Sequence, residues 1–200
     1  GLSYKSTQHF KDFDFENTYL DNTTSTNAFN MDFPAIYSVG LGYSLEMLDV
    51  AVDYRYVDYE NTDGFSEAGW TQTGSVKGFG WESISVISAG VQYKGIDRLP
   101  LRVGYTFSSN PITEEVTFFN APATAIIKNA FQFGFSFKVT ETIEFDMMYH
   151  RGQSDGVTSG QLLNPNFVSQ NNPMGSIPGS NVSYEMTTDL LMAGVKYKFK

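Results

Sequence analysis

The chain has 200 residues, a formal net charge of -9 at pH 7 and no cysteine. The negative charge argues against nucleic acid as a partner, because no basic stripe is present to meet phosphates. The lack of cysteine excludes disulfides, thiolate catalysis and cysteine-based zinc sites. The length suits a single domain, which we expect to span residues 1–200.

Eight segments alternate apolar residues with small or polar ones, as β-strands with two different faces do. In chain order these predicted strands cover about 2–13, 34–45, 48–56, 81–94, 100–108, 131–138, 143–150 and the last stretch up to 199. The sixth is the clearest, because phenylalanine occupies every odd position from 131 to 137. The apolar phase slips between Ser85 and Ile87, which predicts a β-bulge there.

Composition and alternation together favour a membrane protein that crosses with strands. Aromatic residues make up 16% of the chain, yet the mean hydropathy is -0.25. No run of about 18 apolar residues exists, so we expect no transmembrane helix. Most of the segments have about the length of a tilted membrane strand, roughly 9–11 residues. We therefore predict an all-β, antiparallel transmembrane β-barrel in which half of each strand faces lipid and half faces water.

The connections alternate between long and short, as in outer-membrane barrels with long extracellular loops and tight periplasmic turns. With the C-terminus in the periplasm, the long loops at 14–33, 60–80, 109–129 and 152–182 all lie outside the cell. The inner positions are rich in glycine and serine. An eight-stranded barrel is normally filled by its own side chains. Such an interior therefore predicts further strands or a plug, unless the glycines relieve bending strain in a small barrel.

Three stretches resemble one known family. They are GVQYKGIDRLPLRVGYTFSSNPI (90–112), FPAIYSVGLGYSLEMLDVAVDY (33–54) and FQFGFSFKVTETIEFDMMYHRGQS (131–154). All three are similar to the C-terminal part of the FadL-type (OMPP1/FadL/TodX) transporters of the Gram-negative outer membrane. The resemblance implies a barrel of about 14 strands around an N-terminal hatch, with the last eight strands present here. One departure is that Lys200 follows Phe199, whereas such barrels usually end on an aromatic residue.

The chain begins in strand-like alternation, without a starting Met or a signal segment. Either a longer N-terminal part has been removed or this is a mature chain that starts in a strand; we expect the former, and the resemblance implies that the missing part includes the hatch. The resemblance further implies passive uptake of hydrophobic compounds such as long-chain fatty acids or aromatic hydrocarbons. Outer-membrane lipid and the protein's own hatch would be its other partners. Two alternatives remain open: a small eight-stranded structural or adhesive barrel, and a general porin.

Four residues are candidates for ligand binding. The resemblance places Lys77, in the run SVKGFGWESISV, where FadL-type proteins have a basic residue that meets the ligand's carboxylate. Phe79 and Trp81 would supply part of the apolar slot that such a ligand needs. An ordinary solvated loop lysine is the alternative. Arg102 faces the lumen, together with charged residues of the neighbouring strands, namely Asp49, Asp53, Arg55, Glu144 and Asp146. These form a polar track, contact the hatch, or pair across strands.

Other polar groups do not assemble into a recognisable active site or metal site. His150 is a lone inward histidine, and Asp58, Glu60 and Asp63 lack the regular spacing of calcium ligands. We therefore expect no enzyme activity, no metal and no cofactor. One group of apolar loop residues has two interpretations, a landing surface for ligand or packing against neighbouring loops. This group consists of Phe118, Phe119, Ile126 and Ile127.

Overall fold

The computed structural model describes residues 1–19 and 21–199, and it is all-β. Eight antiparallel strands form one sheet in the order β1-β4-β5-β6-β7-β8-β9-β12. Their bounds are β1 (Leu2–Lys5), β4 (Ala35–Ser44), β5 (Leu48–Asp58), β6 (Ile84–Tyr93), β7 (Leu101–Ser108), β8 (Asn129–Lys138), β9 (Ile143–Gln153) and β12 (Thr187–Tyr197). Within 1–19 and 21–199, no helix has the length and apolar character needed to cross a membrane.

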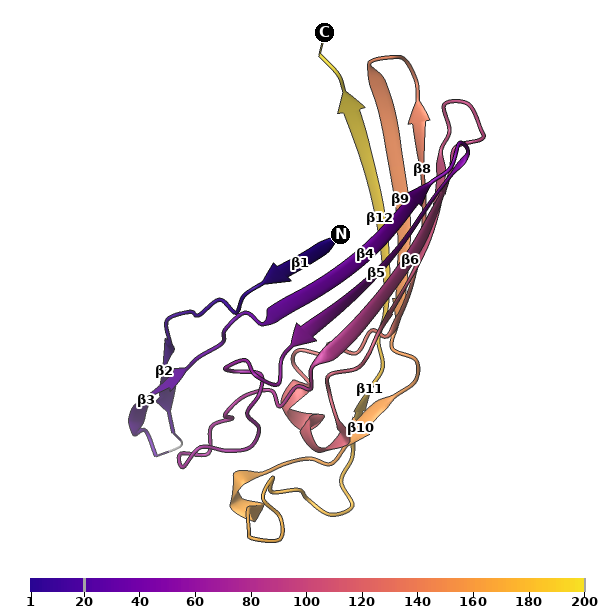
Figure 1. Cartoon of the computed structure of the whole chain (residues 1–200). Helices are drawn as coiled ribbons and strands as arrows, with labels where there is room; N and C mark the ends of the chain where they lie inside the picture. Colours follow the sequence, from indigo (N-terminus) through magenta and orange to yellow (C-terminus); the bar gives the residue numbers. More distant parts are fainter. Residues whose placement is uncertain (20, 200) are drawn as a thin grey trace.

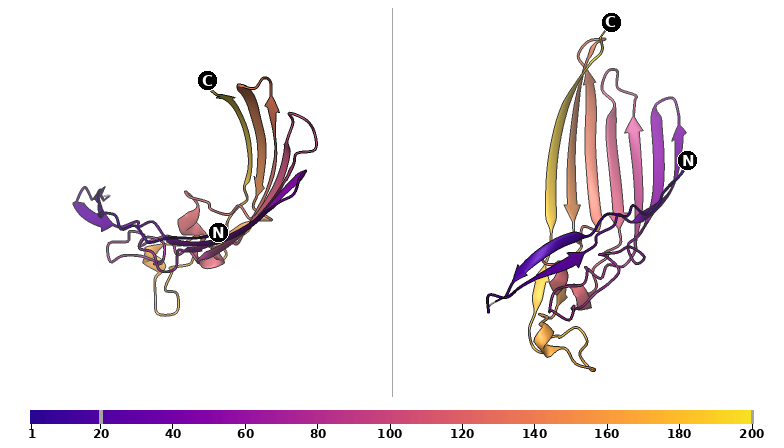
Figure 2. Two further views of the ribbon diagram at one scale, coloured as in Figure 1. Left: turned by 45° about the horizontal axis from the view of Figure 1, so that its top comes forward. Right: turned by 90° about the vertical axis from the view of Figure 1, so that its left-hand side faces the viewer.

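The sheet bends into an open trough (Figures 1 and 2). Its two edge strands, β1 and β12, are not paired with each other in the described residues. The strands of this chain therefore do not close into a cylinder by themselves, which contradicts the alternative of a self-contained eight-stranded barrel.

The sheet has an apolar outer face and a small or polar inner face, as the alternation predicts. Large apolar side chains of the outer face are exposed, and they include Val39, Leu41, Val52, Ile87, Val103, Phe131, Phe133, Leu191 and Val195. Along β6, residues of the inner face are half-buried while their outer-face neighbours are exposed. This difference is expected when the inner face lines the concave side of a curved sheet, because side chains there lie closer together.

Tyrosines gather near both ends of the outer face. Those near the short turns are Tyr43, Tyr93 and Tyr197, and those near the long loops are Tyr37, Tyr56, Tyr105 and Tyr149. Two aromatic girdles that flank an apolar band are typical of barrels in the outer membrane.

The predicted bulge near Ser85 is wrong. Strands β5 and β6 pair without interruption from Leu48 opposite Tyr93 to Val57 opposite Ile84. The apolar phase slips there because Val86, opposite Arg55, faces inward near the loops. The inner face is thus partly apolar at that end of the trough.

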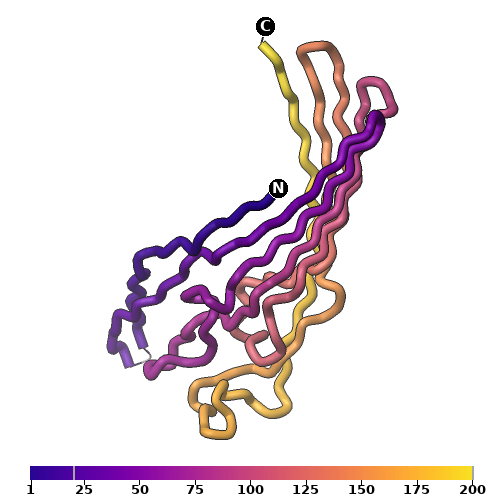
Figure 3. The backbone as a smooth tube through the Cα atoms, in the orientation of Figure 1, coloured from indigo at the N-terminus to yellow at the C-terminus, as the bar shows by residue number. Residues whose placement is uncertain are grey.

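Short turns join the strands at one end, called here the turn end, and long loops join them at the other, the loop end (Figure 3). The turns follow β4, β6 and β8. The loop end carries two small sheets, β2 (Phe13–Thr18) with β3 (Thr24–Phe29) and β10 (Thr158–Gly160) with β11 (Val182–Tyr184). It also carries three 3-10 turns, η1 (Glu114–Val116), η2 (Phe118–Asn120) and η3 (Pro165–Phe167).

The first strand is shorter than predicted, and the polar segment after it is structured. β1 ends at Lys5 rather than near Phe13, and β2 and β3 form a hairpin that projects from the loop end (Figure 1). The alternation Phe13, Asp14, Phe15 belongs to this hairpin, where Phe13 pairs with Phe29. The predicted first strand, 2–13, thus extends past the end of β1, and the predicted loop at 14–33 contains most of the hairpin, because alternation alone does not reveal which strand is the neighbour.

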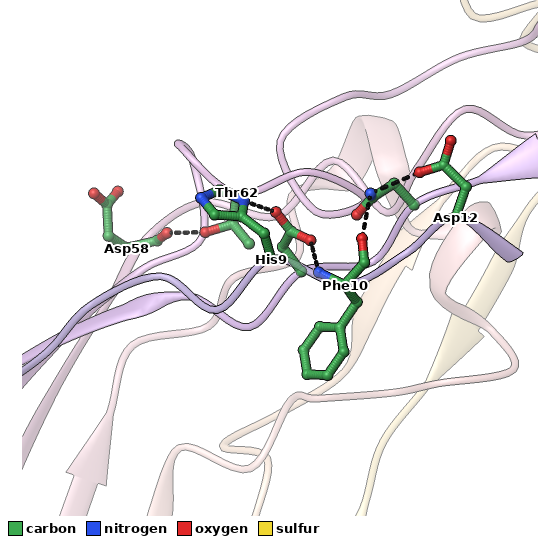
Figure 4. A network of polar contacts seen from close by, with 7 residues as sticks. His9, Phe10, Asp12, Asp58 and Thr62 are labelled. Carbon is green, nitrogen blue, oxygen red and sulfur yellow. Dashed lines mark hydrogen bonds and ion pairs between the residues drawn. The ribbon is translucent and has the colours of Figure 1, made fainter.

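The base of the hairpin is held by Asp32, which contacts His9 and Phe10, both labelled in Figure 4. This carboxylate is 3% exposed, lies 2.5 Å from Nδ1 of His9, and accepts a 2.9 Å hydrogen bond from the backbone N–H of Phe10. Its own N–H donates to the carbonyl of Asp63 at 3.1 Å. Next to it, Gly64 has φ of +82°, and a Cβ there would collide with the Asn30 carbonyl oxygen. These contacts thus hold together three chain segments, those around His9, Asp32 and Asp63.

If the outer face contacts lipid, a charge placed on it must destabilise the protein far more than one on the inner face. We expect Phe133→Arg, near the middle of β8, to lower the unfolding free energy by about 2–4 kcal/mol. Gln132→Arg, one residue earlier and on the inner face, is the matched control and should cost less than about 1 kcal/mol. Urea titration of the intact protein in lipid vesicles measures both values. Equal losses would contradict the assignment of the faces.

The Asp32 clasp predicts a pH dependence. The hydrogen bond from Phe10, and then the one from His9, hold the pKa of Asp32 below its ordinary value although burial opposes them. A lowered folded-state pKa stabilises the hairpin base above about pH 4, and this contribution disappears as the pH falls through the lowered value. Hydrogen-exchange protection of residues 8–33 should therefore fall in acid. We expect Asp32→Asn to remove this pH dependence, whereas Asp12→Asn, at an exposed carboxylate nearby, should keep it.

Candidate functional site

The inner face has a floor of small residues because the strands are in register. Gly42 lies opposite Ala51, Ala51 opposite Gly90, and Gly90 opposite Gly104, across four neighbouring strands. None of these glycines has a positive φ. These residues therefore leave space above the sheet because they lack side-chain volume. The backbone conformation at these positions does not require glycine.

Several hollows lie on this face, one of them along Gly40, Gly42, Ala51 and Asp53, and two others adjoin Arg102. The first of these two, the methionine hollow, has a volume of about 440 Å³ and crosses β7, β8, β9 and β12. Its inward-facing residues are Arg102, Gly104, Gln132, Gly134, Asp146, Met148, Met192 and Gly194. The second, the glycine hollow, has a volume of about 420 Å³ and includes Gly42, Ser44, Asp49, Ala51, Gly90, Gln92 and Arg102. The predicted shortage of side-chain volume on the inner face thus appears as open spaces, two of which share Arg102.

Arg102 forms the ridge between the two hollows, and neutral partners on both sides hold it. Its Nε donates to Oε1 of Gln92 on β6 at 2.6 Å, and its Nη1 donates to Oγ of Ser136 on β8 at 2.8 Å. The hydroxyl of Ser136, which is buried, donates in turn to Asp146. The guanidinium is therefore fixed in orientation by residues of both neighbouring strands.

Two lysines near the turn end form ion pairs across strands, which was one of the predicted interpretations. Lys94 lies 2.7 Å from Asp49, and Lys196 lies 2.8 Å from Glu144 and 3.9 Å from Asp146. By contrast, Arg102 has no acidic partner within 4 Å among the residues that the structure describes.

The loop end has an aromatic cluster that contains two of the predicted ligand residues. Phe79 and Trp81 pack with Tyr59 and Phe65 at ring-centroid distances from 4.9 to 5.7 Å. Nε1 of Trp81 donates to Oδ1 of Asn120 at 2.5 Å, and Nδ2 of Asn120 donates to the carbonyl of Phe79 at 2.8 Å. Both predicted ligand residues are thus half-buried and locked to a neighbouring loop. The sequence-based prediction does not include Asn120. The sequence marks it only as a polar residue directly after two phenylalanines.

The long loops share a hydrophobic core. It consists of Ile112, Val116, Phe119, Ile126 and Leu163, against which Trp70, Trp81, Met174 and Tyr184 pack. Burial raises the pKa of Tyr184 to about 12, and its hydroxyl donates to the carbonyl of Thr117 at 3.1 Å. Phe119 and Ile126 are buried here, so they pack between loops rather than offer a landing surface. Phe118 and Ile127 are half-buried.

Lys77 lies apart from Arg102. It belongs to the loop between β5 and β6 at the loop end, whereas Arg102 follows the turn between β6 and β7 at the turn end. Its side chain is exposed and lines a pocket of about 400 Å³ together with three acidic residues, Asp12, Asp63 and Glu67. The negative charges around Lys77 oppose the approach of an anion.

His150 faces inward, and its Nδ1 lies 3.2 Å from Nε2 of Gln132. Among residues 1–19 and 21–199, no group of three or more His, Asp or Glu side chains is placed to hold a metal ion.

Comparison with known proteins gives one family. The model of the family described as outer membrane protein transport protein (OMPP1/FadL/TodX) matches residues 1–199. No curated protein matches the chain.

Several solved structures have the same fold. The TodX monoaromatic hydrocarbon channel deltaS2 mutant has a TM-score of 0.59 at 15% identity, over 100% of this chain and 46% of that one. The Pseudomonas putida toluene transporter TodX has a TM-score of 0.52 at 14% identity, over 99% and 45%. A Pseudomonas aeruginosa FadL homologue has a TM-score of 0.58 at 13% identity, over 87% and 38%. The chain thus spans less than half the length of these structures, and at such identities the likeness is one of fold.

The loop core predicts a difference between two neighbouring isoleucines. Ile126 is fully buried in it, so we expect Ile126→Ala to destabilise the loop cluster by about 2–5 kcal/mol. Ile127→Ala, at the half-buried next position, should have less than half that effect. Limited proteolysis within residues 109–128 of the folded protein measures the change. Equal cleavage rates in the two variants would show that the loops are held in another way.

Proposed function

Because the chain belongs to the OMPP1/FadL/TodX family of outer-membrane transport proteins, we propose that it forms part of a channel for hydrophobic compounds. The protein lies in the outer membrane of a Gram-negative bacterium, as the members of this family do. On this proposal the trough is one side of a lumen, and the rest of the wall comes from chain beyond these strands. The protein acts as a channel rather than as an enzyme.

The observation that carries the proposal is the contrast between the two faces of the sheet. Exposed phenylalanine, leucine and valine cover the outer face, which suits contact with lipid. The inner face combines small residues with the apolar side chains of Met148 and Met192. In the methionine hollow a solute without charge finds a mostly apolar surface with open volume, of the size that small ligands occupy.

The substrates we propose are aromatic hydrocarbons or long-chain fatty acids. The names of the TodX structures specify a monoaromatic hydrocarbon channel and a toluene transporter, and this supports the first class. Entry is passive and follows the concentration gradient of the compound. The proposed partner inside the lumen is an N-terminal hatch of the same protein.

Lys77, Phe79 and Trp81 stay predicted ligand contacts at the loop end. A ligand can reach only the exposed parts of the two rings, since both are packed in the aromatic cluster. Lys77 would have to attract an anion against the acidic residues that line its pocket. We propose that these three residues serve the entry of ligand, and that the methionine hollow serves its passage.

The test is uptake by proteoliposomes that contain the intact protein. We expect toluene and dodecanoate to enter several-fold faster than into empty liposomes, and sucrose to enter no faster. Entry of sucrose would identify a general porin, and no faster entry of either hydrophobic compound would contradict the proposal.

A matched pair of variants connects the uptake to the inner face. Gly194→Phe places a ring in the methionine hollow, where the nearest atom to an added Cβ is Cβ of Asp146 at 3.9 Å. Ala193→Phe places the same ring on the outer face. We expect Gly194→Phe to slow the uptake several-fold and Ala193→Phe to leave it unchanged.

A further inference from the structure

Arg102 differs from Lys94 and Lys196, two cations near the turn end that form ion pairs. Two of its five N–H donors are used, one by Gln92 and one by Ser136, and both partners are uncharged. The side chain is exposed on the inner face. An arginine held in place by neutral groups keeps its full charge and its remaining donors for another partner.

The acids nearest to Arg102 are already engaged. Asp49 accepts from Lys94 at 2.7 Å and from Gln92 at 2.9 Å. Asp146 accepts from Ser136 and lies 3.9 Å from Lys196, which also pairs with Glu144. Each of these carboxylates therefore has a lysine beside it. Arg102, like Arg55 on β5, has no acidic partner within 4 Å among the described residues, but of these two inward-facing arginines only Arg102 lines the two hollows.

One side of Arg102 is apolar. Met148 and Met192 face each other across β9 and β12, in the same transverse row as Arg102 and Gly134. Methionine side chains are flexible and apolar, and they adapt to chains of varied shape. The glycine hollow on the other side contains Asp49, Ser44 and Gln92 and no methionine, so it is more polar. The methionine hollow also contains one acid, Asp146, which accepts from Ser136.

We propose that Arg102 and the methionine hollow form a binding site for a fatty carboxylate. The carboxylate receives the free N–H donors of Arg102, and the hydrocarbon chain lies along Met148 and Met192 over Gly134 and Gly194. A planar guanidinium suits a planar carboxylate, because two parallel N–H···O bonds can form. The site lies on the wall near the turn end, away from Lys77. This inference rests on the proposed function and specifies an anionic amphiphile as the substrate class for this part of the lumen.

The site predicts that the charge of the ligand is recognised separately from its chain. We use dodecanoate and dodecanol, which share a hydrocarbon chain and differ in the head group, with the intact protein in lipid nanodiscs. Arg102→Met keeps most of the side-chain length and removes the charge. We expect it to weaken dodecanoate binding about tenfold, the order expected for one charge-assisted hydrogen bond. The affinity for dodecanol should stay within about twofold and also reports that the variant is folded.

Two further variants distinguish recognition of the carboxylate by Arg102 from the general electrostatic field of the lumen. Arg55→Met removes another inward-facing arginine, on β5, which lines neither hollow, and it should leave both affinities unchanged. Arg102→Lys keeps the charge but loses the fork of donors, so we expect an intermediate loss for dodecanoate.

Three results would overturn the inference. They are an unchanged dodecanoate affinity in Arg102→Met, an equal loss in Arg55→Met, or a parallel loss of dodecanol binding. If the wild-type protein binds dodecanol and Arg102→Met binds dodecanoate normally, the carboxylate site fails while the hydrophobic channel stands. If the wild-type protein binds neither compound, both proposals fail.

Discussion

The period of two along a β-strand is the constraint on which the rest of this structure depends. Successive side chains of a strand point to opposite faces of the sheet, so the residues that suit one face place no requirement on the residues of the other face. A backbone in lipid must also pair all of its N–H and C=O groups, and antiparallel pairing between neighbours provides this. Eight strands in unbroken register therefore present phenylalanine, leucine and valine outward, and they gather glycine, serine and charge inward.

The same constraint explains why the inner charges pair as they do. Residues opposite each other on neighbouring strands lie close enough to interact. Lys196 lies opposite Glu144, and Gln92 lies opposite both Asp49 and Arg102. Arg102, however, lies opposite Gly134, so the strand on that side offers no acid in the same row. Its unpaired charge follows from the register, and the open space beside it follows from the same glycine.

The strands could be predicted from the sequence because their signal is local. Alternation within about ten residues identifies each strand and its two faces, and the alternation of long and short connections gives antiparallel order. The hairpin of β2 and β3, the loop core and the continuous pairing at Ser85 could not be predicted in this way. The loop core depends on contacts between distant segments, such as the hydrogen bond from Nε1 of Trp70 to the carbonyl of Met174. Apolar residues in loops follow no periodic pattern, so the sequence does not show which of them are buried and which are exposed.

The candidate site shows the same division between local and distant information. As single residues in the sequence, Lys77 and Arg102 are both isolated cations near apolar neighbours. The structure distinguishes them through partners contributed by other segments: Asp12, Asp63 and Glu67 line the pocket of Lys77, while Gln92 and Ser136 support Arg102 without neutralising it. A cation raises the affinity for an anionic ligand only if that cation has no closer negative partner and needs no reorientation to bind. Neither residue has an acidic partner within 4 Å among the described residues, but three acids line the pocket of Lys77, and only Arg102 is held in orientation by neutral hydrogen-bond partners. On our proposal the wall of the trough, rather than its loops, is therefore the place where the charge of a ligand is recognised.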